Sequence, residues 1–189
     1  MTDNEVLKNI KEGDLSSYAK IYTHYFSRLY NYGRKFTEDV SIIEDSIQDI
    51  FLVFWKNKNC LPAVESINSY LISSFRYTLF RQLKQTKKIT GEDEYSGPDF
   101  SAEYFIIRRE MDEELRTRFM HAIQALTPRQ REVIFLRFYE GLSYNEIAGI
   151  MNITVKATYK IMARSLEALK ETLPVQLAII FAILKNPCT

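Results

Sequence analysis

Three cationic side chains recur at every fourth position in the C-terminal part of the chain. They are Lys156, Lys160 and Arg164, and the aromatic Tyr159 and the small Ala163 lie between them. Residues four apart share one face of a helix. Cationic groups can neutralise phosphates and small side chains allow close approach to base edges, so the stripe is typical of a helix in the DNA major groove. The alternative is a helical hairpin whose lysine face is merely solvated.

The sequence before this stripe contains two helix-start signals in close succession. Thr127 and Gln130 form a capping box around a proline at the first helical position, and Gly141 is placed to end that helix. Ser143 and Glu146 form a second capping box directly afterwards. A short helix is therefore predicted to begin after Ser143.

A tight turn is predicted between this short helix and the cationic one. Asn152 can adopt the left-handed conformation that such a turn needs, and Thr154 can cap the helix that follows. Residues 127–169 are thus predicted to form a helix-turn-helix. The apolar side chains expected to hold its two helices together are Ile147, Ala148, Met151, Ile153, Val155, Met162 and Leu166.

The sequence contains none of the patterns that indicate an enzyme or a metal site. Cys60 and Cys188 have no Cys-x-x-Cys spacing and are accompanied only by His24 and His121. Nucleophile elbows, phosphate-binding glycine loops and His-Glu-x-x-His motifs are missing. We therefore expect no catalytic residues, no metal, no cofactor and no small-molecule substrate, and we interpret both thiols as structurally incidental.

A net charge of +1 is unusual for a nucleic-acid binder, but the charge is unevenly distributed. Residues 61–88 contain five basic residues and one acidic residue, a net charge of +4. Residues 91–114 contain nine acidic and two basic residues, a net charge of −7. Solvated helix faces would explain either run alone, but their adjacency at a change of composition argues against that interpretation.

Apolar residues recur at helical spacing in almost every segment, so the predicted fold class is all-α. In the first domain, Gly13 and Asp14 separate two helices, and further helices are predicted over residues 40–56 and 66–87. The inward stripe predicted for the helix after Asp14 is Leu15, Tyr18, Ala19, Tyr22, Phe26, Leu29, Gly33 and Phe36. The inward residues predicted for the next two helices are Ile43, Ile47, Ile50, Phe54, Ile67, Tyr70, Leu71, Phe75, Leu79 and Leu83.

Two small helical domains are predicted, because residues 88–103 have the glycine, proline, serine and acidic composition of a linker. The second domain begins with a helix whose inward stripe is Met111, Leu115, Phe119, Ile123 and Leu126. The predicted organisation is a first domain at 1–88, a flexible acidic linker at 89–109, a helix-turn-helix domain at 110–173 and an apolar tail at 174–189.

Three segments resemble region 4 of the extracytoplasmic-function (ECF) sigma factors of the sigma-70 family. They are LTPRQREV (126–133), EGLSYNEIA (140–148) and VKATY (155–159). In that family the recognition helix of region 4 binds the −35 promoter element. The resemblance implies this role for Lys156, Tyr159, Lys160 and Arg164.

The segment EDSIQDIFLVFW (44–55) is similar to region 2.2 of the same family, the helix that docks on core RNA polymerase. Asp45, Gln48, Asp49 and Leu52 share a helix face opposite the buried stripe, where carboxylates can meet basic groups of a partner helix. Trp55 fits either the core or the edge of such an interface. A solvated acidic face is the alternative interpretation.

Residues 69–84 resemble region 2.3, which helps to open the −10 element and to hold its non-template strand. Basic and aromatic side chains neutralise the backbone of single-stranded DNA and stack on its bases. The residues assigned to this role are Arg76, Tyr77, Phe80, Arg81 and Lys84, with Phe75, Lys87 and Lys88 beside them in the sequence. Tyr77 and Arg81 depart from the family pattern, so the resemblance does not carry over the individual contacts. Residues 57–65 lie where the family has the loop that receives a flipped promoter base.

The resemblance covers residues 5–88 and 110–172 and implies a sigma factor that binds core RNA polymerase and recognises promoter DNA. It also implies an anti-sigma factor as a partner. The alternative is a helix-turn-helix regulator that acts without polymerase, but the first domain lacks the alternating strands and helices of a phosphoacceptor domain. Asp3 and Glu5 stand where a secretory signal needs positive charge, so we expect a cytoplasmic protein.

The acidic linker suggests that it shields the basic faces of the free protein. Neutral replacements of Glu92, Asp93 and Glu94 are then expected to raise the affinity for DNA in the absence of core polymerase. Affinity measured at low salt tests this expectation, and an unchanged value would contradict it.

The tail contains an apolar run at 177–184, which is too short for the roughly 20 residues of a membrane span. It is predicted either to pack against the chain's own domains or an inhibitory partner, or to complete the core of the second domain. Deleting residues 174–189 without an effect on stability or partner affinity would contradict both interpretations.

Overall fold

The computed structural model describes residues 3–60, 66–90 and 113–172. Regular secondary structure within these ranges is entirely helical, so the all-α prediction is confirmed. The chain divides into two compact units, Met1–Tyr95 and Ser96–Thr189. The acidic linker from residue 91 on, Met111, loop residues 61–65 and the tail lie outside the described residues.

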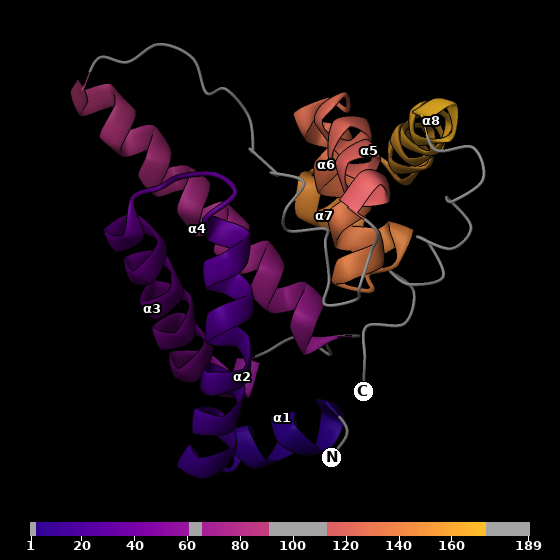
Figure 1. Ribbon diagram of the computed structural model, residues 1–189. Helices are drawn as coiled ribbons and strands as arrows, with labels where there is room; N and C mark the ends of the chain where they lie inside the picture. Colours follow the sequence, from indigo (N-terminus) through magenta and orange to yellow (C-terminus); the bar gives the residue numbers. More distant parts are fainter. Residues whose placement is uncertain (1–2, 61–65, 91–112, 173–189) are drawn as a thin grey trace. The chain divides into compact units, whose positions relative to one another are not determined.

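The first unit is built from four long helical elements and one short turn in its described part (Figure 1). They are α1 (Asp3–Lys11), α2 (Leu15–Gly33), α3 (Val40–Lys56), the 3-10 turn η1 (Lys58–Cys60) and α4 (Ile67–Thr90). α3 packs along α4, α2 contacts both, and α1 lies against α2 and η1. The core therefore lies between α2, α3 and α4.

Two aspartates fix the starts of the helices that carry this core. The carboxylates of Asp14 and Asp39 accept hydrogen bonds from backbone N–H groups in the first turns of α2 and α3. The Ser17 hydroxyl and the N–H groups of Ser16 and Ser17 hold the pKa of Asp14 below its ordinary value. The predicted boundary before α2 and the predicted range of α3 are confirmed, and α4 continues past residue 87 to Thr90.

Most of the core predicted for α3 and α4 is confirmed. The buried residues are Ile43, Ile47, Ile50, Phe54, Ile67, Leu71, Phe75 and Leu79. Tyr70 and Leu83 are half-buried.

The stripe predicted for α2 is wrong in part. Leu15 is 65 % exposed, and Ala19 is also exposed. The residues that α2 buries beside Leu29 and Gly33 are Ser17, Ile21, Tyr25 and Tyr32. α2 carries aromatic residues on two neighbouring stripes, so helical spacing alone could not decide which stripe faces α3 and α4.

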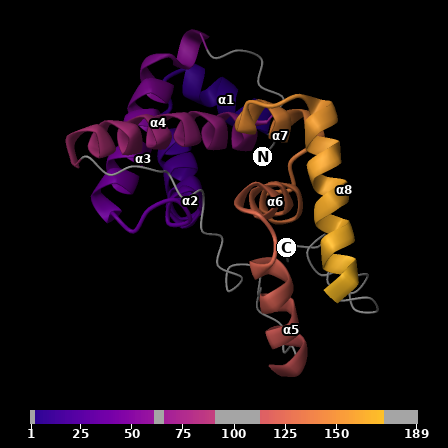
Figure 2. The same ribbon diagram turned by 90° about the horizontal axis from the view of Figure 1, so that it is seen from above.

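The second unit, in its described part, is also a helical assembly. Its elements are α5 (Glu113–Gln124), α6 (Pro128–Ile134), the π-helical segment η3 (Phe135–Tyr139), α7 (Tyr144–Met151) and α8 (Val155–Thr172). α8 packs against α5, α6 and α7, and Figure 2 shows α6 nearly end-on beside it. The buried members of the predicted α5 stripe are Phe119, Ile123 and Leu126.

Both predicted capping boxes are present. Thr127 and Gln130 cap α6, and Ser143 and Glu146 cap α7, with reciprocal side-chain and backbone hydrogen bonds in each case. Gly141 follows the first helix with a positive φ of 72°, as expected of a residue that ends a helix. The π-helical segment η3 between α6 and Gly141 was not predicted.

The turn between α7 and α8 agrees with the prediction. Asn152 has φ 53° and ψ 51°, the left-handed conformation, and the Thr154 hydroxyl accepts a hydrogen bond of 3.2 Å from the Ala157 N–H. Most of the predicted packing residues are confirmed as buried, namely Ile147, Ala148, Met151 and Met162, with Ile153 and Leu166 half-buried. Val155 is instead 37 % exposed, because a side chain at the first helical position projects beyond the end of the helix.

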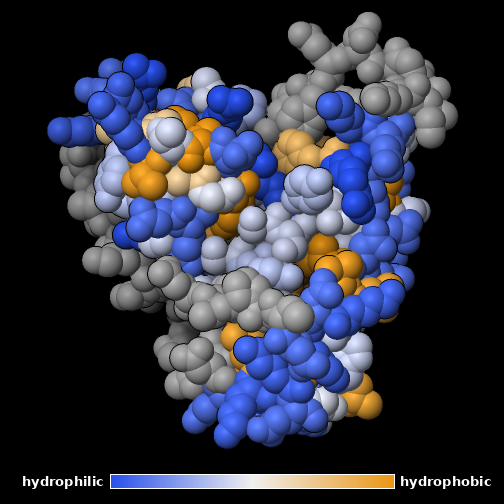
Figure 3. Space-filling model, turned by 180° about the vertical axis from the view of Figure 1, so that it is seen from behind, coloured by the Kyte–Doolittle hydropathy of each residue, from blue (hydrophilic) through white to orange (hydrophobic). Residues whose placement is uncertain are grey.

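The face of the protein in Figure 3 is mostly hydrophilic, with hydrophobic side chains in separate groups. No helix within the described ranges has both the length and the hydropathy that are needed to cross a membrane. The same ranges contain no cluster of three or more His, Cys, Asp or Glu side chains that could hold a metal ion.

Gly33 marks a close approach of three helices in the first unit. A Cβ at this position would lie 2.8 Å from Cγ2 of Ile43 and 2.9 Å from Cζ of Phe75. We therefore expect Gly33→Ala to lower the free energy of unfolding by about 1–3 kcal/mol through overpacking, measured by urea unfolding. Gly149→Ala in α7 is the control, because a Cβ there meets nothing within 4 Å and should stabilise its helix slightly. Equal effects of both changes would contradict the packing argument.

Candidate functional site

The residues predicted to contact the −35 element all lie on the solvent-facing side of α8. Lys156, Lys160 and Arg164 are exposed, and Tyr159 is 54 % exposed. The opposite side of α8 is buried through Thr158, Met162, Ser165 and Leu169. The predicted outward orientation of the cationic stripe is therefore confirmed.

The charge on this side of α8 changes sign after Arg164. Glu167 and Glu171 are exposed at the positions three and seven residues further on. These carboxylates would repel phosphates. The part of α8 suited to nucleic acid is thus its N-terminal half.

Tyr159 is not an isolated side chain. Its ring stacks on the ring of Tyr144, the first residue of α7, with centroids 4.1 Å apart and an interplanar angle of 30°. The guanidinium carbon of Arg137 in η3 lies 5.0 Å from the centroid of the Tyr144 ring. The sequence analysis missed Arg137 and Tyr144, because a stack between separate helices has no spacing signature along the chain.

The predicted docking face of α3 is exposed to solvent. Asp45, Gln48 and Asp49 are exposed, and Leu52, about one turn further along the same face, is 56 % exposed. Trp55 is half-buried, which fits the edge of an interface better than the core. This face of α3 therefore combines carboxylates with one exposed apolar side chain.

The ring of Trp55 connects this docking face to α2. The Tyr18 ring lies 4.8 Å from it, and Nζ of Lys58 lies 3.9 Å above it. The Tyr18 hydroxyl donates a hydrogen bond of 3.1 Å to the Phe51 carbonyl, and burial raises the pKa of Tyr18.

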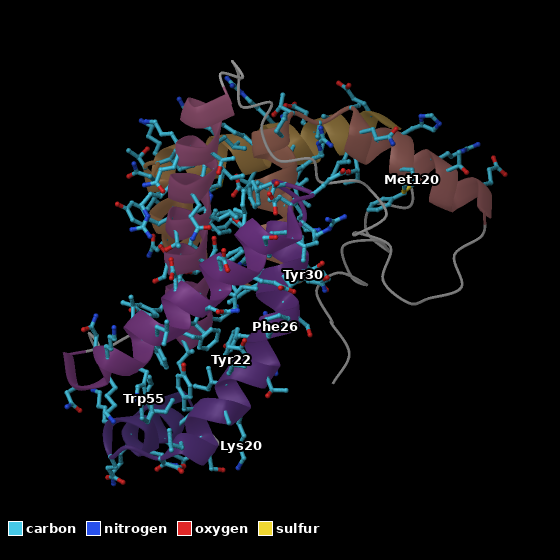
Figure 4. The ribbon with its side chains drawn as sticks, turned by 90° about the vertical axis from the view of Figure 1, so that its left-hand side faces the viewer. Lys20, Tyr22, Phe26, Tyr30, Trp55 and Met120 are labelled. Carbon is cyan, nitrogen blue, oxygen red and sulfur yellow. The ribbon has the colours of Figure 1, made fainter. Side chains whose placement is uncertain are left out.

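A row of half-buried aromatic rings continues along α2 from Tyr18. Tyr22, Phe26 and Tyr30 follow one another up the helix, as Figure 4 shows. The Tyr22 and Phe26 centroids are 5.6 Å apart, and those of Phe26 and Tyr30 are 6.3 Å apart. The sequence analysis placed three of these four residues in the core, but the row forms a partly accessible border beside Trp55.

The residues assigned to the −10 strand lie in the middle of α4, between positions 76 and 84. Tyr77 is 71 % exposed, and Arg81 and Lys84 are exposed. Phe80 is less available, because its ring packs against Phe36 at 5.2 Å and the Arg76 guanidinium lies 4.4 Å above it. The side chains of Lys87 and Lys88 lie outside the described residues. Tyr77 is therefore the assigned aromatic ring with the freest access to a base.

A groove of about 650 Å³ runs between α3 and α4. Its lining residues are Asp49, Ile50, Leu52, Val53, Lys56, Tyr70, Ser73, Ser74, Tyr77, Thr78 and Arg81. The predicted docking face and the predicted strand-binding residues thus border the same groove.

An ion pair joins these two sets of residues across the groove. Arg81 Nη2 lies 3.8 Å from Asp49 Oδ2, and both side chains are 51 % exposed. Gln82 Nε2 donates a hydrogen bond of 3.3 Å to the same carboxylate oxygen. The sequence analysis assigned Asp49 and Arg81 to different partners and did not place them in contact.

Known proteins resemble this chain in both sequence and fold. The family model for sigma-70 region 4 matches residues 116–169. The ECF RNA polymerase sigma factor SigK of Mycolicibacterium vanbaalenii is 26 % identical over 174 residues, which are 90 % of this chain and 88 % of that protein. SigK of Mycobacterium tuberculosis is 24 % identical over 173 residues, 90 % of this chain and 92 % of that protein. The chain is an ECF sigma factor.

Solved structures show that the fold of this sigma factor is shared. The structure of CnrH in complex with the cytosolic domain of CnrY covers 91 % of this chain and 97 % of that chain, with a TM-score of 0.57 and 19 % identity. The sigma factor RpoE in complex with the anti-sigma factor NepR, from Bartonella quintana, covers 85 % of this chain and 99 % of that chain, with a TM-score of 0.58 and 18 % identity.

Proposed function

We propose that this sigma factor divides promoter-specific transcription initiation between its two units. The first domain, residues 1–88, docks on core RNA polymerase and holds the opened −10 element. The helix-turn-helix domain, residues 110–173, binds the −35 element, and residues 89–109 link the two. The protein catalyses no reaction itself and acts in the cytoplasm, together with the polymerase.

The exposed cationic face of α8 is the observation that carries this proposal. Lys156, Lys160 and Arg164 can contact phosphates along one wall of a major groove, and Tyr159 and Ala163 lie beside them, where base edges would be. The glutamates that follow limit the contact to the N-terminal half of α8. This is the geometry of a recognition helix that enters the groove with its first turns.

Docking on polymerase is assigned to the exposed face of α3. The carboxylates of Asp45 and Asp49 precede the apolar Leu52 on one face, and the combination suits an amphipathic partner helix with basic residues. Trp55 and the aromatic row of α2 extend the face with large half-buried rings, which are enriched at interfaces.

Holding the non-template strand is assigned to α4. Tyr77 offers a ring that is 71 % exposed, and Arg81 and Lys84 supply positive charge within one or two turns of it. The groove between α3 and α4 gives an unstacked nucleotide room beside that ring.

Tyr77→Ala is expected to weaken open-complex formation by the holoenzyme by about fivefold to a hundredfold, the value of one base–aromatic stack. The protein's own stability should hardly change, because the side chain is mostly exposed. Permanganate footprinting of the melted region measures the effect. Tyr77→Phe is the matched control and should retain most activity; equal losses in both variants would show that the ring itself is not what contacts the strand.

An anti-sigma factor is proposed as a further partner. The two solved relatives are complexes with the CnrY cytosolic domain and with the anti-sigma factor NepR. An inhibitor that occupied the acidic face of α3 would prevent docking on polymerase. Competition between such an inhibitor and core polymerase for the full-length protein tests this idea.

The decisive experiment for the proposed function is reconstitution. The purified protein is added to bacterial core polymerase, and promoter-specific transcripts are sought on a genomic DNA library. Transcripts that start at a common sequence pattern would support the proposal. Failure to bind core polymerase, with duplex binding intact, would favour a regulator that acts alone.

A further inference from the structure

We propose that Tyr144 is a positioning residue for promoter recognition, which holds the ring of Tyr159 in the orientation in which α8 meets DNA. This inference rests on the proposed function of the exposed face of α8. Tyr144 itself belongs to α7, the other helix of the helix-turn-helix.

The geometry of the two rings restricts the orientation of Tyr159. Their centroids are 4.1 Å apart and the planes are inclined by only 30°, so the rings are stacked over one another. An exposed aromatic side chain on a helix ordinarily exchanges between rotamers. With one face of its ring covered by Tyr144, Tyr159 keeps a single orientation and presents the remaining face and edge to solvent.

Tyr144 is itself held in place by neighbouring residues other than Tyr159. It directly follows Ser143, whose N–H donates to the Glu146 carboxylate at 2.7 Å in the capping box of α7. The Arg137 guanidinium lies 5.0 Å from the centroid of the Tyr144 ring and also donates a hydrogen bond of 2.8 Å to the Leu142 carbonyl. The three side chains Arg137, Tyr144 and Tyr159 therefore connect η3, α7 and α8.

Ordering Tyr159 in the free protein affects its affinity for the promoter. A side chain that must be ordered when a complex forms reduces the affinity, and ordering it beforehand removes that loss. For one flexible side chain the difference corresponds to about threefold to tenfold in affinity. Tyr144 should therefore strengthen promoter binding without touching DNA, and only as long as Tyr159 is present.

The test uses the holoenzyme and a fluorescent promoter duplex selected from a random-sequence library by the wild-type holoenzyme. Tyr144→Ala is expected to weaken binding about threefold to tenfold, whereas Tyr144→Phe, which keeps the stacked ring, should bind like the wild type. In a Tyr159→Ala background, Tyr144→Ala should add no further loss. An equal loss in both backgrounds would overturn the proposal, because Tyr144 would then act on DNA or on stability by itself.

A matched control comes from another aromatic stack in the same unit. The rings of Tyr139 and Phe135 are stacked 4.7 Å apart within η3. Tyr139→Ala removes a similar ring and should show no coupling to Tyr159→Ala in the same binding assay. Coupling of equal size in this control would overturn the specific role of Tyr144.

A second readout separates failure of this inference from failure of the proposed function. Ring-proton chemical shifts of Tyr159 in the full-length protein, assigned with Tyr159→Phe, should move toward those of an unstacked tyrosine in Tyr144→Ala. Unchanged shifts would overturn the inference and leave the proposed function intact. If the shifts move but Tyr159→Ala binds the promoter like the wild type, the assignment of Tyr159 to DNA fails, and its positioning by Tyr144 fails with it.

Discussion

Joint replacement of Lys156, Lys160 and Arg164 by alanine should lower the affinity of the holoenzyme for its promoter by about a hundredfold or more at moderate salt. Each lost phosphate contact should also reduce the slope of log affinity against log salt by about 0.9, so the triple variant should lose nearly three. The side chains are exposed, so the domain should fold normally. Binding measured over a salt series tests both numbers.

Lys170→Ala is the matched control for this prediction. Lys170 is also exposed on α8, but it lies beyond Glu167, where the charge of the face has changed sign. Its replacement should change promoter affinity by less than about twofold and leave the salt slope unaltered. A triple variant whose slope equals that of the wild type would show that α8 does not contact the phosphates.

The combined variant Asp45→Arg and Leu52→Ala should weaken binding to core polymerase by about a hundredfold or more. Charge reversal at Asp45 places an arginine against the basic residues of the proposed partner helix, and loss of Leu52 removes the exposed apolar side chain of the face. Among the described residues Asp45 takes part in no hydrogen bond or ion pair, so its replacement disturbs little within the protein. Titration of the labelled sigma factor with core polymerase measures the affinity.

Glu12→Arg provides the same change of charge away from the docking face. Glu12 is exposed directly after α1. This variant should bind core polymerase within about twofold of the wild type. If both variants bound equally well, the face of α3 would not be the docking site.

The helix boundaries could be predicted from the sequence because the signals that set them are local. Thr127, Ser143 and Thr154 each accept a hydrogen bond from the backbone N–H three residues ahead, so the partner is already given by the sequence. Asn152 likewise needs only its own backbone to accept a left-handed turn. The outward side of α8 followed from the same local information, once the helix start was known.

The orientation of α2 could not be predicted, because it depends on competition between two stripes. Tyr18 and Tyr22 fit helical spacing as well as Ile21 and Tyr25 do, and only contact with α3 and α4 decides between them. The π-helical segment η3 was missed for a related reason. Its shifted hydrogen bonds arise from packing in the folded unit and have no sequence signature.

Contacts between residues on different helices could not be predicted from the sequence either. The stack of Tyr144 on Tyr159 and the ion pair of Asp49 with Arg81 each join residues on different helices. Helical spacing assigns a residue to a face, but it does not determine which other helix lies beside that face. The sequence therefore suggests members for each proposed site but not the side chains that contact them.

The ion pair between Asp49 and Arg81 affects how genetic data on this protein must be interpreted. Replacing Asp49 leaves Arg81 without this ion pair, so in the proposed roles a defect of an Asp49 variant would report on strand binding as well as on docking. An Asp45 variant would test the proposed docking on polymerase without disturbing this ion pair. The charge-swapped double variant Asp49→Arg and Arg81→Asp would keep the ion pair while it inverts the charge at both proposed contacts, so no suppressor in a single partner would restore both.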